Sequence, residues 1–232
     1  MLTIETLQAG YGPAQVLFDI SFAVGDGEIV TMLGRNGMGK TTTISTLMGL
    51  LPARGGRAVF DGVALTGLPP YRVAQAGIGL VPEGRQIFPT LTVEENLIAT
   101  AAARGKPARW TREAVYKLFP KLAERRASLG GQLSGGEQQM LAVGRALMTN
   151  PKLLILDEAT EGLAPLIRNE IWNCLAQLKA EGQSILLVDK HLDALLKLAD
   201  RHVVIEKGYV VWSGASAALI ADDSIRQRYL QV

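Results

Sequence analysis

One run of eight residues could hold a polyphosphate. The segment "GRNGMGKT", Gly34 to Thr41, fits the spacing G-x-x-x-x-G-K-[ST], and its glycines allow a tight turn whose backbone N–H groups face phosphates. Lys40 can reach the β- and γ-phosphates as a point charge, the Thr41 hydroxyl can ligate Mg²⁺, and Thr42 adds a second hydroxyl. The residues predicted to bind the nucleotide are Gly34, Asn36, Gly37, Met38, Gly39, Lys40, Thr41 and Thr42.

Two carboxylates follow an apolar run in "LLILDE", residues 153–158. A phosphate loop that acts on a nucleotide needs an acid on a neighbouring strand to hold Mg²⁺, and Asp157 suits that role. Glu158 comes next, so it projects in a different direction and can polarise a water in line with the γ-phosphate. Together with the phosphate loop, this pair predicts nucleotide hydrolysis.

A second candidate anion site lies in "LSGGEQQ", residues 133–139. Ser134, Gly135 and Gly136 stand where a helix should begin, and free N–H groups beside a hydroxyl favour a bound anion there. The chain already carries a stronger phosphate loop. One phosphate-binding segment is enough to hold one nucleotide, so the presence of a second candidate site needs a separate explanation.

These residues must be positioned by alternating strands and helices. Apolar runs, alternation and glycine boundaries indicate strands over 2–12, 17–24, 27–34, 55–67 (a hairpin or edge strand), 78–84, 152–159, 184–190 and 202–214 (a hairpin). Helical patterns cover 43–51, 93–105, 111–126, 134–150, 166–182, 192–200 and 217–230. This order predicts an α/β core interrupted by a helical insertion.

Composition narrows the possible partners and compartments. The chain has 232 residues, 48% of them hydrophobic, and its 24 basic against 22 acidic residues give no reason to expect a nucleic-acid partner. No basic leader with an apolar run opens the sequence, and no stretch reaches the ~18 apolar residues that span a bilayer. We expect a soluble chain that something else holds at a membrane. The single cysteine, Cys174, suggests a buried structural thiol.

The phosphate loop, "LSGGEQQ" and "LDEAT", in this order and spacing, resemble the ATP-binding cassette (ABC) ATPases over essentially the whole chain. The resemblance implies an α/β fold with a P-loop NTPase (RecA-like) core, an N-terminal antiparallel β subdomain and an inserted α-helical subdomain. It implies one domain over 1–232, with 1–88 and 149–232 as core and β subdomain and 89–148 as the helical subdomain. ATP and Mg²⁺ are the implied cofactors.

In this family two cassettes pack head to tail, and each signature segment completes the ATP site of the other. The second anion site then has a purpose, because a helix N-terminus stabilises a charge that neither cassette encloses alone. The residues that the resemblance assigns to this contact in trans are Ser134, Gly135, Gly136 and Glu137.

Other family positions carry over one at a time. Tyr11 stands where the family has an aromatic ring that stacks on adenine, and Glu83 takes the position of a glutamine that senses Mg²⁺. Ala164 stands where the family generally has an aspartate in its dimer-contact loop. The switch histidine falls on Lys190 in an ungapped alignment and on His191 if the alignment shifts by one residue. Either cation could contact the γ-phosphate.

The segments "VPEGRQIFPTLTVEENL", "EGLAPL" and "LADRHVVIEKGYVVWSG" resemble one branch, the ATP-binding subunits of branched-chain amino acid importers. This implies a peripheral subunit on the cytoplasmic face of a bacterial inner membrane. Its partners would be a second cassette (a second copy or a different ATPase subunit), membrane permease subunits and, indirectly, a periplasmic binding protein. The alternatives are urea or amide import, lipid or polysaccharide export, a non-transport ABC ATPase and a regulatory nucleotide-binding module.

Overall fold

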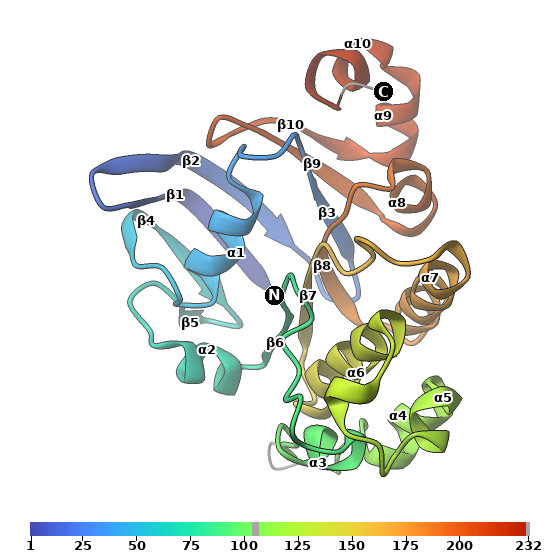
Figure 1. The fold of residues 1–232 in the computed structure, drawn as a ribbon. Coiled ribbons are helices and arrows are strands. Elements are labelled where there is room, and N and C mark those ends of the chain that lie inside the picture. Colours follow the sequence, from blue (N-terminus) through green and yellow to red (C-terminus); the bar gives the residue numbers. More distant parts are fainter. Residues whose placement is uncertain (104–106, 231–232) are drawn as a thin grey trace.

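A single curved sheet runs through the computed structural model, which describes residues 1–103 and 107–230 (Figure 1). The strands in these ranges follow the order β5-β4-β1-β2-β10-β9-β3-β8-β7-β6. They are β1 (Leu2–Tyr11), β2 (Ala14–Val24), β3 (Ile29–Leu33), β4 (Ala53–Phe60), β5 (Val63–Ala64), β6 (Ile78–Val81), β7 (Leu153–Asp157), β8 (Ser184–Val188), β9 (Arg201–Glu206) and β10 (Tyr209–Ala215).

Two kinds of strand pairing divide this sheet. The pairs β1–β2, β1–β4 and β4–β5 are antiparallel, whereas β3, β8, β7 and β6 pair in parallel, as does β3 with β9. The hairpin of β9 and β10 adds one antiparallel pair beside the parallel strands. The two parts meet where β10 pairs with β2 through Tyr209 and Asp19. The chain therefore has an α/β core with an antiparallel β layer formed by its N-terminal strands, as the sequence predicts.

Helices cover both faces of the parallel strands, as such sheets require (Figure 1). The described helices are α1 (Lys40–Leu47), α2 (Pro70–Ala76), α3 (Val93–Ile98), α4 (Arg112–Leu118), α5 (Pro120–Glu124), α6 (Gly135–Met148), α7 (Pro165–Ala180), α8 (Leu192–Leu198), α9 (Ser216–Ala221) and α10 (Asp223–Ile225). Short turns of 3-10 and π helix cover Gly130–Gln132 and Arg226–Leu230. None of the helices in residues 1–103 and 107–230 is both long enough and apolar enough to cross a membrane.

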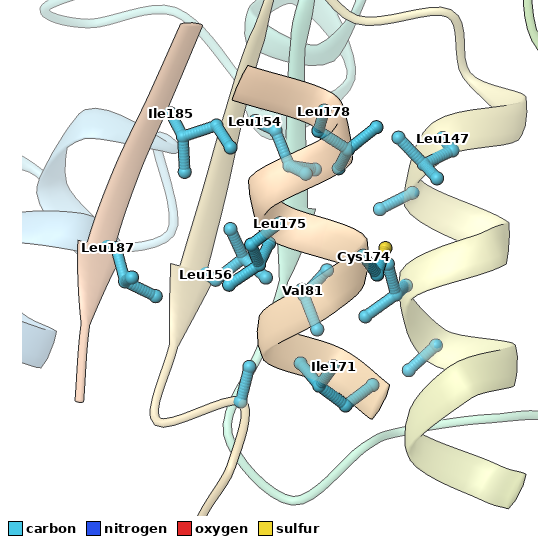
Figure 2. Packing of buried hydrophobic residues seen from close by; sticks show 14 of the residues in the cluster. Val81, Leu147, Leu154, Leu156, Ile171, Cys174, Leu175, Leu178, Ile185 and Leu187 are labelled. Atoms are coloured by element: carbon cyan, nitrogen blue, oxygen red, sulfur yellow. The ribbon is translucent and has the colours of Figure 1, made fainter. Parts of the chain in front are cut away.

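Helix α7 fills the space between the sheet and α6 (Figure 2). Its inward side chains, among them Leu175 and Leu178, are fully buried and belong to the same cluster as Leu154 of β7, Ile185 of β8 and Leu147 of α6. A buried aliphatic side chain contributes about 1.5–3 kcal/mol through its removal from water, so this cluster firmly fixes the ends of β7 and β8.

Cys174 belongs to the same cluster and is 4% exposed. Burial raises the pKa of its thiol to about 12, so the thiolate does not form at neutral pH. The prediction of a buried, structural thiol is confirmed.

Several predicted helix boundaries are wrong. The helix predicted over 93–105 ends at Ile98, and residues 104–106 lie outside the described residues. The helix predicted over 111–126 is split into α4 and α5, because Pro120 begins a new helix and forces Phe119 out of the helical region, to φ −127° and ψ 79°. The C-terminal helix predicted over 217–230 is likewise divided, at Asp222.

Helix α2 was not predicted, although its sequence carries signals at both ends. Pro70 occupies its first turn, where a missing N–H costs nothing, and Gly77 ends it with a left-handed φ of 118°. The helices α3 to α6 form the group between β6 and β7 (Figure 1). We propose that this group is the subdomain 89–148, with 1–88 and 149–232 as the rest of a single domain.

A fully buried histidine ties the C-terminal segment to the strand that leads into the phosphate loop. His202 on β9 lies 2.6 Å from the Thr31 hydroxyl through Nδ1 and 2.8 Å from the Ser216 hydroxyl through Nε2. Ser216 donates its own proton to the Ala199 carbonyl, so it accepts from Nε2, and Thr31 donates to Nδ1. The ring is neutral in this arrangement, and burial lowers its pKa to about 4.

We predict that His202 makes the fold sensitive to acid. The pKa of His202 is 6.5 in the unfolded chain and about 4 in the folded one. Below pH 6.5 the unfolded state therefore binds a proton that the folded state does not bind until the pH approaches 4. Stability should fall by about 2.5 kcal/mol between pH 7.5 and 4.5 because of this group. Urea unfolding of a His202→Gln variant should lack that part of the loss, whereas a His191→Gln control should retain it. Equal pH dependence in all three proteins would contradict the assignment.

Candidate active site

The phosphate loop connects the buried strand β3 to α1 at the carboxyl end of the sheet (Figure 1). Gly34 has φ 140°, and a Cβ there would lie 2.3 Å from the Ile205 carbonyl oxygen, so only glycine fits. Gly39 caps α1 with φ 110° and has no side-chain cap, so no side chain of its own occupies the first N–H groups of α1. This is the geometry that favours a phosphate at a helix N-terminus.

Lys40 lies beneath this loop and points back along it. Its Nζ donates to the carbonyl of Gly34 at 2.7 Å and to that of Arg35 at 2.9 Å. Burial lowers the pKa of the ammonium group, while the carboxylates of Glu158 and Asp157 act in the opposite direction. The side chain is 9% exposed, so its charge acts in a weakly screened environment on whatever binds the loop.

Asp157 is the last residue of the fully buried strand β7, and its charge acts on Lys40 of the phosphate loop. It is 3% exposed, burial raises the pKa of its carboxyl, and a hydrogen bond from the Thr41 hydroxyl works to lower it. Its Oδ1 finds no hydrogen-bond partner among the described residues. An orphaned carboxylate oxygen beside a hydroxyl matches the hard oxygen ligands of Mg²⁺, so the residues present fit that ion.

Glu158 leaves the strand by a turn in the left-handed region. Its φ is 50°, and its N–H donates to the Val188 carbonyl at 2.9 Å. Burial raises the pKa of its carboxyl, an effect that Lys190 opposes. A left-handed non-glycine residue is strained, and such strain is found where a side chain must be aimed.

A pocket of 470 Å³ brings most of the predicted residues together. It joins the phosphate loop to the ends of β6, β7 and β8, and its lining consists of Val16, Asn36, Gly37, Gly39, Lys40, Thr41, Thr42, Glu83, Glu158, Glu161 and Lys190. Carboxylate oxygens of Glu83, Glu158 and Glu161 all lie within 4.8 Å of one another. Facing these acids, Lys190 contacts both Glu158, at 3.2 Å, and Glu161.

The two candidates for the switch position differ in their surroundings. Lys190 lines the pocket, whereas His191 Nδ1 lies 2.7 Å from the Asp189 carboxylate and 3.1 Å from the Thr160 hydroxyl. Thr160 also donates to Asp189 at 2.6 Å. His191 therefore belongs to a polar network with Asp189 and Thr160 and is not one of the residues that line the pocket.

The segment "LSGGEQQ" forms the start of α6, as predicted. Ser134 accepts a hydrogen bond from the Glu137 N–H at 3.3 Å, and the Glu137 carboxylate accepts one from the Ser134 N–H at 2.8 Å. This capping box stabilises the helix start. A Cβ on Gly136 would lie 2.5 Å from Ile167 of α7, and one on Gly135 would lie 2.7 Å from the Arg85 guanidinium. Packing against Ile167 therefore requires glycine at 136, whereas the flexible Arg85 side chain could move away from a Cβ at 135.

None of the signature residues Ser134 to Glu137 lines the phosphate-loop pocket. The residues predicted to form a second anion site therefore lie outside the lining of the phosphate-loop pocket.

A family model described as "ABC transporter" matches residues 17–161 of the chain. The high-affinity branched-chain amino acid transport ATP-binding protein BraG of Pseudomonas aeruginosa is 44% identical over 231 residues, which cover 99% of each chain. The chain belongs to the ABC transporter ATP-binding family. It is therefore an ABC ATPase cassette that binds nucleotide, and its phosphate loop and acidic strand carry the family's motifs.

Other relatives of this cassette serve different transport systems. The lipopolysaccharide export system ATP-binding protein LptB of Haemophilus influenzae is 34% identical, over 99% of this chain and 97% of its own. Among solved structures, a nucleotide-free ATP-binding cassette from an ABC transporter has a TM-score of 0.84 at 28% identity, covering 100% of this chain and 98% of its own. A cassette in its ADP conformation has a TM-score of 0.81 at 28% identity and covers 98% and 97%.

Three features of the cassette's pocket differ from the sequence-based picture. Asp157, predicted to hold Mg²⁺, is not among the lining residues. Tyr11 ends β1, is 52% exposed and lies outside the pocket lining, which Val16 joins instead from the same hairpin. Glu161 also lines the pocket and was not predicted. Its spacing of three residues from Glu158 is compatible with a turn, but its contact with Lys190 is a tertiary one that no local pattern reveals.

We predict that the strain at Glu158 is measurable. A left-handed residue with a Cβ costs about 1–2 kcal/mol relative to glycine, so Glu158→Gly should be about 1 kcal/mol more stable than Glu158→Ala in urea unfolding. Glu161, which is outside the left-handed region, is the matched control. There the alanine variant should be the more stable of the two, by about 0.4–1 kcal/mol. The same order at both positions would rule out strain at Glu158.

Proposed function

We propose that this cassette hydrolyses ATP to power import of branched-chain amino acids. The observation that carries the proposal is the 44% identity to BraG over 99% of both chains, together with a pocket lined by Lys40 and Glu158. The buried Asp157 directly precedes that glutamate in the chain. Export of lipopolysaccharide is less well supported, because the LptB relatives are 34% and 32% identical.

The chain's own groups divide the work on the nucleotide. The phosphate loop would cradle the polyphosphate through its N–H groups, and Lys40 would leave the carbonyls of Gly34 and Arg35 to pair with the β- and γ-phosphates. Thr41, Asp157 and Glu83 would hold Mg²⁺, which supplies positive charge to the β- and γ-oxygens. Tyr11 would offer its exposed ring to adenine.

Glu158 would orient the attacking water and accept its proton. Burial raises the pKa of this carboxyl, which makes it a better base than an ordinary glutamate at a given distance. Lys190 is our choice for the switch residue because it lines the pocket beside Glu158, whereas His191 is held by Asp189 and Thr160. A fixed cation there would contribute charge near the γ-phosphate without titrating.

The second anion site suits a nucleotide held by another cassette. The N-terminus of α6 is exposed at Ser134 and partly exposed at Gly135, and its dipole favours negative charge. In a head-to-tail pair, a copy or a different ATPase subunit would present these residues to the γ-phosphate above Lys40 of its partner, with Glu137 holding Ser134 in place.

Transport would follow from closure of that pair. The cassette would work as a peripheral subunit on the cytoplasmic face of a bacterial inner membrane, attached to permease subunits that a periplasmic binding protein supplies. Binding of ATP would bring two cassettes together and move the permease, and hydrolysis would reset it.

We predict that two single substitutions separate binding from hydrolysis. Lys40→Ala should abolish turnover by removing the cation beside the phosphates, and Glu158→Gln should lower it by about 100-fold or more while ATP still binds. Steady-state ATPase assays and titration with a fluorescent ATP analogue would measure both. Glu170→Gln, which alters an exposed ion pair with Lys121, is the control and should behave as wild type. Near-normal turnover by Lys40→Ala or Glu158→Gln would contradict the site assignment.

We predict that Ser134→Arg blocks hydrolysis yet leaves ATP binding to a single chain largely intact. The added bulk and charge would keep a second cassette from closing on this helix, while the phosphate loop is untouched. Thr92→Arg removes the same type of capping box from α3 and controls for the lost cap. Equal loss of turnover in both variants would mean that only helix stability is involved.

The cargo is tested in cells. Disruption of the gene should abolish high-affinity uptake of labelled leucine, isoleucine and valine, and the wild-type gene but not the Lys40→Ala gene should restore it. Unchanged uptake of these amino acids, with loss of urea or amide uptake instead, would redirect the proposal to another substrate.

A further inference from the structure

Glu161 reaches the pocket by way of a tight turn. Its N–H donates to the Glu158 carbonyl at 3.1 Å, which places the two residues on one side of the loop that follows β7. Both side chains line the phosphate-loop pocket. The side chain of Glu158 is 12% exposed and that of Glu161 is 46% exposed, so one carboxylate lies within the site and the other at its mouth.

Lys190 bridges these two carboxylates from the end of β8. Its Nζ lies 3.2 Å from Glu158 Oε2 and makes its shorter contact with Glu161 Oε1. The Lys190 side chain is 46% exposed, the same fraction as the Glu161 side chain, whereas the Glu158 side chain is 12% exposed. The ion pair with Glu161 is therefore its main contact, and the contact with Glu158 is the longer one.

The charges around this lysine explain why the second carboxylate matters. An ammonium group has three donors, and two of them are directed at Glu161 and Glu158. Without Glu161, Lys190 would keep only Glu158 as its partner and could close on it. A base whose oxygen is committed to an ammonium ion is less free to accept a proton from water.

We propose that Glu161 is a positioning residue for ATP hydrolysis, which anchors Lys190 at the mouth of the pocket so that Glu158 keeps an oxygen for water. This rests on the proposed function, in which Glu158 is the base and Lys190 lies by the γ-phosphate. Glu161 touches neither the water nor the nucleotide in this account. Glu161 contacts both the Glu158 carboxyl and Lys190, and in this proposal its effect on turnover is assigned to the lysine.

If Glu161 only contributed to the stability of the fold, its substitution would have different effects on the kinetics. An exposed lysine–glutamate pair contributes little to stability, so loss of the pair alone should leave folding and ATP binding nearly unchanged. A positioning role should instead lower kcat and spare KM. It should also vanish when Lys190 is absent, because residues that act through one another are not additive.

Steady-state ATPase kinetics of five proteins test this. They are wild type, Glu161→Gln, Lys190→Met, the double variant, and Glu170→Gln, which breaks an ion pair of similar exposure to Lys121 at 2.8 Å. We expect Glu161→Gln to lower kcat about tenfold with KM within about twofold. In the Lys190→Met background the same change should alter kcat less than about twofold, and Glu170→Gln should match wild type. Glu161→Asp, which keeps the charge, should recover most of the lost rate.

Other outcomes overturn the proposal. They are an unchanged kcat for Glu161→Gln, a change confined to KM, or losses that multiply in the double variant. Urea unfolding identifies a variant that fails to fold, and Glu161→Asp then supplies the comparison. Turnover retained by Glu158→Gln would contradict the proposed function itself, whereas its loss beside a normal Glu161→Gln would contradict this inference alone.

Discussion

The site depends on one constraint, which is that parallel strands end at the same edge of a sheet. Strands β3, β8 and β7 are adjacent, and all of their residues are buried. A charged residue can therefore be presented only where such a strand ends. Lys40, Glu158 and Lys190 come after β3, β7 and β8, so charges that are far apart in sequence meet in one pocket.

The charge balance at that edge is the second element of the account. Glu83, Glu158 and Glu161 line a pocket together with Lys40 and Lys190, and the buried Asp157 interacts electrostatically with Glu83 and Lys40. Carboxylates this close together repel one another unless cations lie between them. A bound nucleotide would bring negatively charged phosphates, and Mg²⁺ would bring positive charge. The acids and lysines of this pocket therefore suit a nucleotide together with Mg²⁺ better than the nucleotide or the ion alone. The helix of the signature segment lies elsewhere on the chain, and a second cassette would bring one to the phosphates.

Much of this could be read from sequence, because glycine and charge requirements are local. The spacing from Gly34 to Thr41 predicted the loop, and the apolar run before Asp157 predicted the strand that presents it. The proline and glycine signals for α2 were also present, but the prediction did not use them. At Pro120, helical periodicity outweighed the signal for a break. By contrast, the contact of Glu161 with Lys190 and the packing of Gly136 against Ile167 depend on how distant elements meet, which no short pattern encodes.

The most direct test of the account is the mass of the Glu158→Gln protein by light scattering in Mg²⁺-free buffer, with and without ATP. If each phosphate loop requires the signature helix of another cassette, ATP should double the mass, either of this chain alone or of its mixture with the second cassette of its complex. The Ser134→Arg change should abolish that increase in the self-paired case. A chain that binds ATP yet stays monomeric under both conditions would contradict the two-cassette site.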